Sequence, residues 1–182
     1  MKSGEFWTLL SNAVLTLLTS LHSWTHKAAH PLQTNEEILT EYVTAARMIF
    51  DTIGKVPRYM RPTFGSSDAR TIAIFRALGL IPVQWTRSSG DTMYNSEASY
   101  RNITWHVKNW INSSNPEGII SLHHSSFYRW SEKALPSVVE AVKNSTYKAV
   151  KMSECLNKQG VGGPYLTSGL FYSFVTSPII KF

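Results

Sequence analysis

The chain has 182 residues, of which 43% are hydrophobic and 16% are charged, and its formal net charge is +6. This length suits one domain with a core of its own, and the composition excludes a disordered chain. The positive charge would suit an anionic partner, but the basic residues are scattered and no recognition motif accompanies them. We therefore expect no nucleic-acid binding.

Residues 6–21 are mostly apolar and too few for a comfortable membrane span, so we expect no stable span. One interpretation is the apolar core of a signal peptide, and the other is a buried strand over 13–21 that delivers His22 to a sheet. We favour the strand, because only Lys2 is basic, Glu5 offsets it, and no cleavage-site pattern follows.

Cysteine content and sequons bear on the compartment. The single cysteine, Cys155, excludes an internal disulfide and is expected to be a small buried apolar group. Three sequons, at Asn102, Asn112 and Asn144, would accept glycans in a secretory pathway. They favour a secreted or cell-wall-associated protein.

From residue 34 onward, helical and extended patterns alternate. Thr34 and Glu37 have the spacing of a capping box, and Gly54 is a typical residue to end the helix that follows. The pattern predicts helices over 34–54, 66–79, 96–114 and 131–145, the last kinked or delayed by Pro136, and strands over 58–63, 80–85, 118–124 and 147–152. Four such alternations predict a parallel α/β sheet or barrel. The periodicity is lost after Gly160, and no element is predicted there.

Polar side chains follow four of the expected strands. Because ligands of parallel α/β folds collect at the carboxyl ends of strands, these residues are expected to gather at one end of the sheet. The alternative, that they are unrelated loop residues, stays open at this point. The residues are His22, His26, Arg61, Asp91, His123 and His124.

Three histidines, His22, His26 and His30, recur at intervals of four. The first two could reach one metal ion from a helical turn or from a loop after a strand. On a helix, eight residues rise about 12 Å, whereas zinc–nitrogen bonds are about 2.0–2.1 Å. His30 is therefore interpreted as a loop residue before Pro31 and not as a ligand.

Five segments between residues 21 and 156 together resemble the polysaccharide deacetylases with a NodB-type domain, and especially the fungal chitin deacetylases. "HSWTH" is similar to the family's H-[ST]-x-x-H metal motif, and "RYMRPTFG" to its R-P-P-Y-G segment. "ALGLIPVQW" resembles the strand before its D-x-x-D-W motif, "GIISLHH" its I-S-L-x-H segment, and "YKAVKMSECL" the fungal ending. All five occur in the family's order and spacing.

The resemblance implies an incomplete distorted (β/α) barrel of the NodB type within the α/β class. It also implies the removal of acetyl groups from N-acetylglucosamine units of chitin-like polymers, with a divalent metal that is usually zinc.

The family motifs also imply roles for single residues. His22 and His26 would be the metal ligands, and His124 the general acid, oriented and charge-tuned by Asp91. Arg61 would hold the base carboxylate, and Leu122 would line the pocket for the acetyl methyl group. His123 would have a structural role.

Departures from the family pattern predict that the site is incomplete. The family's T-F-D-D-G strand supplies the base and the third metal ligand, but here no Asp precedes His22. Residues 1–160 are therefore expected to form a partial deacetylase domain without the first β/α units, and residues 161–182 an apolar tail. Ser88 and Thr92 stand where the D-x-x-D-W motif has Asp and Trp, and Thr63 replaces a proline.

Two hypotheses follow from these departures. One is a deacetylase that is inactive as this chain, its amino-terminal part lost to truncation or to a gene-model error. The other is a non-catalytic relic of the fold that binds carbohydrate or is purely structural.

Overall fold

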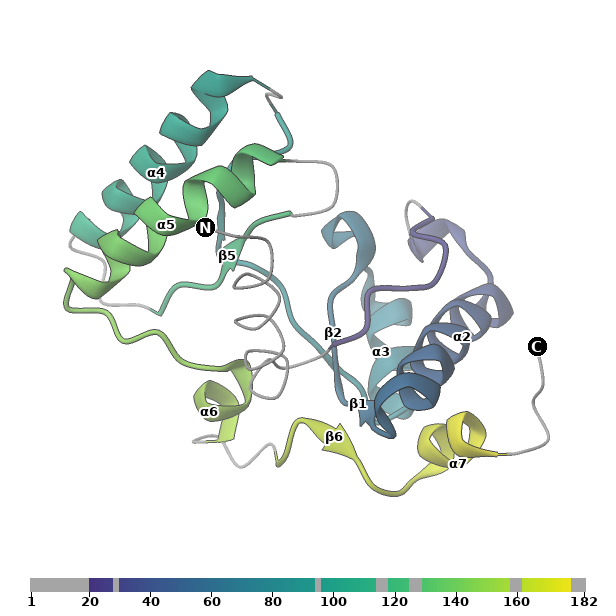
Figure 1. The fold of residues 1–182 in the computed structure, drawn as a ribbon. Helices are drawn as coiled ribbons and strands as arrows, with labels where there is room; N and C mark the ends of the chain where they lie inside the picture. The colour runs from purple at the N-terminus through teal and green to yellow at the C-terminus, as the bar shows by residue number, and fades with distance from the viewer. Residues whose placement is uncertain are drawn as a thin grey trace. The chain divides into compact units, whose positions relative to one another are not determined.

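The computed structural model describes residues 20–27, 30–93, 96–113, 118–124, 129–157 and 162–177. The chain divides into two compact units (Figure 1). Unit 1 comprises Met1–Val83 and Lys151–Phe182, and unit 2 comprises Gln84–Val150. Most of the strand expected over 13–21 lies outside the described residues. Among the residues that are described, no helix is both long and apolar enough to cross a membrane.

Helix α2 (Asn35–Ile53) is the longest helix described in unit 1, and it confirms the predicted helix. The Thr34 side chain accepts from the Glu37 amide, and the Glu37 side chain accepts from the Thr34 amide, so the capping box is formed. Gly54 ends the helix in the left-handed region at φ 67°. The face of α2 that is buried in unit 1 carries Ile38, Glu41, Tyr42, Ala45 and Ala46.

Two short parallel strands, β2 (Tyr59–Met60) and β3 (Ile81–Pro82), pair in unit 1. Helix α3 (Ala69–Ala77) connects them, and Leu21 adds a parallel bridge to Met60. The predicted strands over 58–63 and 80–85 and the helix between them are therefore confirmed. Asp68 caps α3 through the Thr71 amide, which explains why the helix begins at Ala69.

The segment 147–157, which runs from the last residues of unit 2 into unit 1, differs from the sequence-based prediction. Residues 147–151 form no strand, and helix α6 (Met152–Asn157) begins inside the predicted strand. The prediction was wrong because this alternating segment pairs with no strand in the described structure, and residues 148–150 are exposed. Cys155 is exposed as well, so its prediction as a buried apolar group was also wrong.

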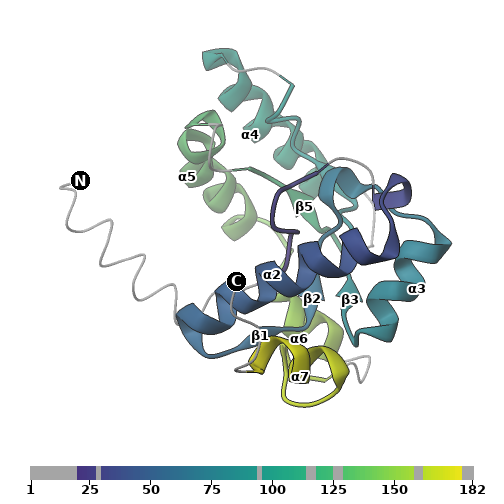
Figure 2. The same ribbon diagram turned by 90° about the vertical axis from the view of Figure 1, so that its right-hand side faces the viewer.

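Two elements lie in the region for which the sequence predicted none. Strand β6 (Tyr165–Leu166) pairs antiparallel with β1 (Val56–Pro57), and helix α7 (Leu170–Thr176) packs beside α2 (Figure 2). Phe171 and Val175 of α7 are buried in the core of unit 1.

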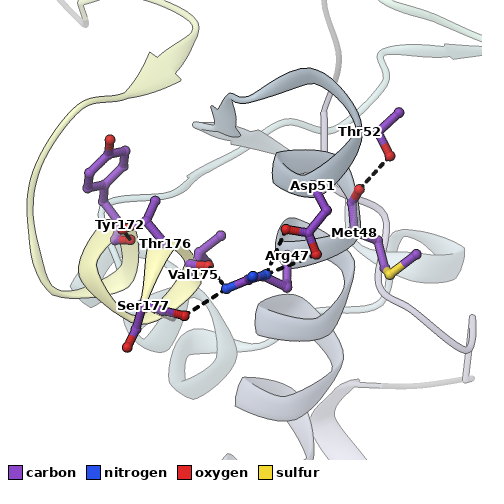
Figure 3. Close-up of polar contacts among 8 residues, drawn as sticks. All are labelled: Arg47, Met48, Asp51, Thr52, Tyr172, Val175, Thr176 and Ser177. Atoms are coloured by element: carbon purple, nitrogen blue, oxygen red, sulfur yellow. Dashed lines mark hydrogen bonds and ion pairs between the residues drawn. The ribbon is translucent and has the colours of Figure 1, made fainter. Parts of the chain in front are cut away.

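Arg47 joins α2 to the end of α7, as Figure 3 shows. Its Nη1 donates to the carbonyl oxygens of Val175 at 3.1 Å and Ser177 at 2.7 Å, while its Nε lies 2.9 Å from an Asp51 carboxylate oxygen. The last carbonyls of a helix lack partners within the helix, and a cation there also complements the helix dipole. Arg47 therefore fixes the carboxyl-terminal helix on α2.

The described residues of unit 2 form two helices and a pair of short strands. Strand β4 (Arg87–Ser88), which the sequence did not predict, pairs parallel with the predicted β5 (Ser121–Leu122). Helices α4 (Glu97–Asn112) and α5 (Arg129–Lys143) confirm the predicted helices and lie side by side in Figures 1 and 2. Pro136 lies inside α5 without delaying its start.

His30 is a buried core residue, so its prediction as a loop residue was wrong. It begins the short 3-10 helix η1 (His30–Leu32), and its side chain is 0% exposed. The ring packs against Tyr42 and Phe75, its Nδ1 lies 3.2 Å from the Ser66 carbonyl oxygen, and its Nε2 lies 3.2 Å from the Tyr42 hydroxyl. The prediction failed because these partners come from segments far from residue 30 in the sequence.

Burial lowers the pKa of His30 below its ordinary value of 6.5. The unfolded chain therefore binds more protons than the folded chain as the pH falls through 6.5, and this residue's contribution to stability is lost on acidification. We expect His30→Gln, which cannot titrate, to flatten the fall in the free energy of unfolding below that pH in urea titrations. An unchanged slope in His30→Gln would contradict this assignment.

Candidate functional site

The first candidate group lies in unit 1, where the main chain leaves the bridge at Leu21. The Leu21 amide donates to the Tyr59 carbonyl at 2.9 Å, and the Arg61 amide donates to the Leu21 carbonyl at 2.9 Å. This pairing places His22 beside Arg61, and His22 Nδ1 lies 2.8 Å from the Arg61 carbonyl oxygen. Because a carbonyl can only accept, Nδ1 carries the proton in the neutral ring and the lone pair lies on Nε2. Histidine ligands of metals commonly have this arrangement.

His26 lies against His22, as its place in the motif suggests. The two ring centroids are 4.9 Å apart with planes at 84°, and the His26 ring also contacts Phe64 at 4.9 Å. Ser23, His26 and Phe64 all have positive φ, between 55° and 56°. Such backbone is uncommon outside glycine and asparagine and persists where the surroundings impose it, often at functional sites. The two imidazoles are thus held together by a constrained loop.

Glu41 of α2 holds that loop, a role that sequence reasoning missed. Its Oε2 accepts from the Trp24 amide at 2.9 Å and the Thr25 amide at 2.7 Å, and its Oε1 accepts from the Thr25 hydroxyl at 2.6 Å. Burial raises the pKa of Glu41, but these hydrogen bonds outweigh it and the pKa lies below its ordinary value. The available signal was an acidic residue between Ile38 and Tyr42 on the apolar face of the predicted helix.

The second candidate group lies in unit 2, where Asp91 and His124 are in contact. The carboxylate of Asp91, which is 1% exposed, lies 3.1 Å from His124 Nδ1. It also accepts from the His124 amide at 2.5 Å and from the Ser131 hydroxyl at 2.8 Å. Burial raises the pKa of Asp91, but hydrogen bonds from His124 and Ser131 outweigh it, so the pKa lies below its ordinary value. Asp91 is therefore an anion that fixes the ring of His124.

A small pocket lies beside this pair. Its volume is about 180 Å³, and its lining includes His123, His124, Ser131 and the apolar side chains of Leu135 and Val138. Burial lowers the pKa of His123, which favours its neutral form. Leu122, the last residue of β5, is half-buried two residues before His124.

The structure thus brings the expected residues together in two separate groups. His22, His26 and the main chain of Arg61 meet in unit 1, and Asp91 meets His124 in unit 2. That all of them gather at one end of a sheet stays a prediction, as do their individual roles. Within the described ranges, no group of three or more His, Cys, Asp or Glu side chains could hold a metal ion. The contact between the rings of His22 and His26, and the tautomer of His22 with its lone pair on Nε2, suit these two residues as metal ligands. Two ligands are one short of the three protein ligands typical of catalytic zinc.

Comparison with known proteins connects these groups to one family. Residues 18–83 match the family model described as polysaccharide deacetylase. Chitin deacetylase 1 of Cryptococcus neoformans is 30% identical over 158 residues, which cover 76% of this chain and 33% of that protein. The solved chitin deacetylase of Colletotrichum lindemuthianum is similar with a TM-score of 0.74 at 17% identity, covering 81% of this chain and 66% of that one. The chain therefore spans about a third of the length of the curated relative.

A further solved relative is a CE4 family pseudoenzyme from Bacillus anthracis. It is similar with a TM-score of 0.63 at 21% identity, over 75% of this chain and 45% of that one. A mutant of the same pseudoenzyme is described as having restored enzymatic activity. Together these likenesses confirm the expected fold class, the distorted α/β barrel of the NodB type, of which this chain covers a part.

Proposed function

Because the chain is a relative of the polysaccharide deacetylases, we propose that it carries the histidine-bearing part of a metal-dependent N-deacetylase site. The substrate would be a chitin-like polymer of N-acetylglucosamine, and the reaction the hydrolysis of its acetamido groups. The observation that carries this proposal is the contact of Asp91 with His124 at 3.1 Å, because these residues were expected to act together from their motifs alone. The direct test is acetate release from chitin oligomers.

His124 is suited to the role of general acid. In the imidazolium form both ring nitrogens donate, so Nδ1–H can donate to Asp91 while Nε2–H donates to the leaving amine. The anionic Asp91 stabilises that imidazolium and fixes its orientation through the additional bond to the His124 amide. Leu122 would line the pocket for the acetyl methyl group.

His22 and His26 would hold the metal ion, which we propose is zinc. A divalent metal in such a site polarises the amide carbonyl and lowers the pKa of water. Arg61 would hold the base carboxylate, and the hydrogen bond from His22 to the Arg61 carbonyl ties that residue to the first ligand. Among the described residues, no carboxylate joins the histidine pair in a group that could hold a metal ion, so the pair lacks a third ligand there.

Zinc binding to the purified chain is expected to be weak. Two neutral imidazoles leave zinc without a third protein ligand, and protonation of both rings on acidification should abolish binding. The measurement is a zinc titration, followed through the histidine ring resonances at two pH values, with His22→Ala as the control. Tight stoichiometric binding that survives His22→Ala would contradict the assignment.

A non-catalytic relative is the second candidate function. Ser88 and Thr92 occupy positions where the family motif has Asp and Trp, and a pseudoenzyme is among the solved relatives. Such a protein would bind chitin oligomers without releasing acetate, even when a base and a metal carboxylate are supplied. Binding and acetate release, measured on the same preparations, separate the two functions.

We also propose a secreted or cell-wall location. The asparagines of the three sequons, Asn102, Asn112 and Asn144, are all exposed on or next to the helices of unit 2. Exposed acceptor asparagines are compatible with glycans on the folded protein. The similarity to a fungal chitin deacetylase supports the same location.

A further inference from the structure

A buried carboxylate connects helix α2 to the loop between the two candidate metal ligands. Glu41 is 7% exposed, and each of its three donors belongs to Trp24 or Thr25, which lie between His22 and His26 in sequence. Both carboxylate oxygens are used, Oε2 for two amides and Oε1 for one hydroxyl. Glu41 therefore binds the loop at Trp24 and Thr25.

The loop needs such a hold because its backbone is in a sparsely populated conformation. Ser23 and His26, on either side of the residues bound by Glu41, have φ of 56°. The hydrogen bonds within the loop include one from the His26 amide to the Ser23 hydroxyl oxygen at 3.1 Å, and this bond is exposed. An exposed bond competes with water, whereas the three bonds to Glu41 are partly buried. Charged acceptors also form the stronger hydrogen bonds.

We propose that Glu41 is a positioning residue for the metal site, holding the main chain at Trp24 and Thr25 so that both imidazoles face one ion. This inference rests on the proposed function, because it takes His22 and His26 as the ligands. Glu41 is not counted as a ligand, because no group of three or more His, Cys, Asp or Glu side chains among the described residues could hold a metal ion, and both of its oxygens accept from the loop. Partners that orient metal ligands typically affect metal affinity about 10–100-fold when they are removed.

The test compares variants of the full chain by nuclear magnetic resonance. Glu41→Ala removes all three bonds, whereas Glu41→Gln keeps an oxygen for the two amides. Thr25→Val removes only the hydroxyl bond at 2.6 Å and is a milder variant should Glu41→Ala not fold. Glu36→Ala is the matched control, because Glu36 is an exposed acid on the same helix, five residues before Glu41.

Two readouts are measured on each variant. The first is the nuclear Overhauser effect between the rings of His22 and His26 in metal-free protein. The centroids of these two rings lie 4.9 Å apart. The second is zinc affinity, taken from the shifts of the same ring resonances. We expect Glu41→Ala to lose the ring–ring effect and to bind zinc about 10–100-fold more weakly. Glu41→Gln and Thr25→Val should lie between Glu41→Ala and the wild type, and Glu36→Ala should match the wild type.

The outcomes separate this inference from the proposed function. A folded Glu41→Ala variant that keeps the ring–ring effect and the zinc affinity, and loses only thermal stability, overturns the positioning role. If Glu41→Ala does not fold, wild-type readouts in both Glu41→Gln and Thr25→Val overturn it as well. If no zinc response depends on His22, the metal assignment is wrong, while the ring–ring effect in metal-free protein still decides the role of Glu41.

Discussion

Acetate release from chitin oligomers is expected to be undetectable with this 182-residue chain, with or without zinc, and to appear once a segment with an Asp-Asp strand is joined ahead of residue 20. General-base assistance contributes about a hundred- to ten-thousand-fold to such reactions. No Asp occurs among the first fifty residues to supply it. The same segment would supply a carboxylate to the histidine pair, which alone offers two of the three ligands typical of catalytic zinc.

His124→Ala in the extended chain is the control for this prediction. If His124 is the general acid, its removal should lower acetate release by about a hundred- to ten-thousand-fold. Equal zinc-dependent release from the extended and unextended chains would contradict the expectation that a base is missing. A folded extended chain that binds the oligomers but releases no acetate would favour the non-catalytic alternative.

Removal of the Asp91 carboxylate is expected to destabilise unit 2. Asp91→Ala leaves the Ser131 hydroxyl and the His124 amide without their acceptor, and a buried donor left in this way costs about 1–3 kcal/mol. Because the folded-state pKa of Asp91 lies below 3.8, its stabilisation is present above that pH and is lost as the pH falls through the folded-state pKa. Urea unfolding at neutral and acidic pH should therefore show a difference from wild type that shrinks with acid.

Asp51→Ala provides the matched control. Asp51 is an aspartate whose side chain is 48% exposed, in an ion pair with Arg47 on the surface of α2, and such pairs contribute about 0–1 kcal/mol. A loss for Asp91→Ala no larger than that for Asp51→Ala, or one that persists unchanged in acid, would show that the contacts of Asp91 contribute little to folding.

Features that depend on neighbours in sequence were predicted correctly. The capping box of Thr34 and Glu37 and the glycine that ends α2 involve groups within one helical turn. The family resemblance, and not a local property of the chain, paired His22 with His26 and Asp91 with His124, and the structure shows both contacts. Periodicity and short-range hydrogen bonding are properties of the local chain, so they can be read before any tertiary contact is known.

Features that depend on distant partners could not be read in this way. Residues 147–152 have an alternating pattern without a sheet to pair with, and Arg47 meets its carbonyl partners only because α7 packs on α2. The sequence near His30 does not show that its ring is buried against Tyr42. The position of Glu41 on the apolar face of its helix signals burial, but it does not identify Trp24 and Thr25 as the partners. Local propensity therefore specified helices α2 to α5 and the caps of α2. Burial and the pairing of remote backbone groups, which depend on the packed chain, determined what each buried polar side chain holds in place.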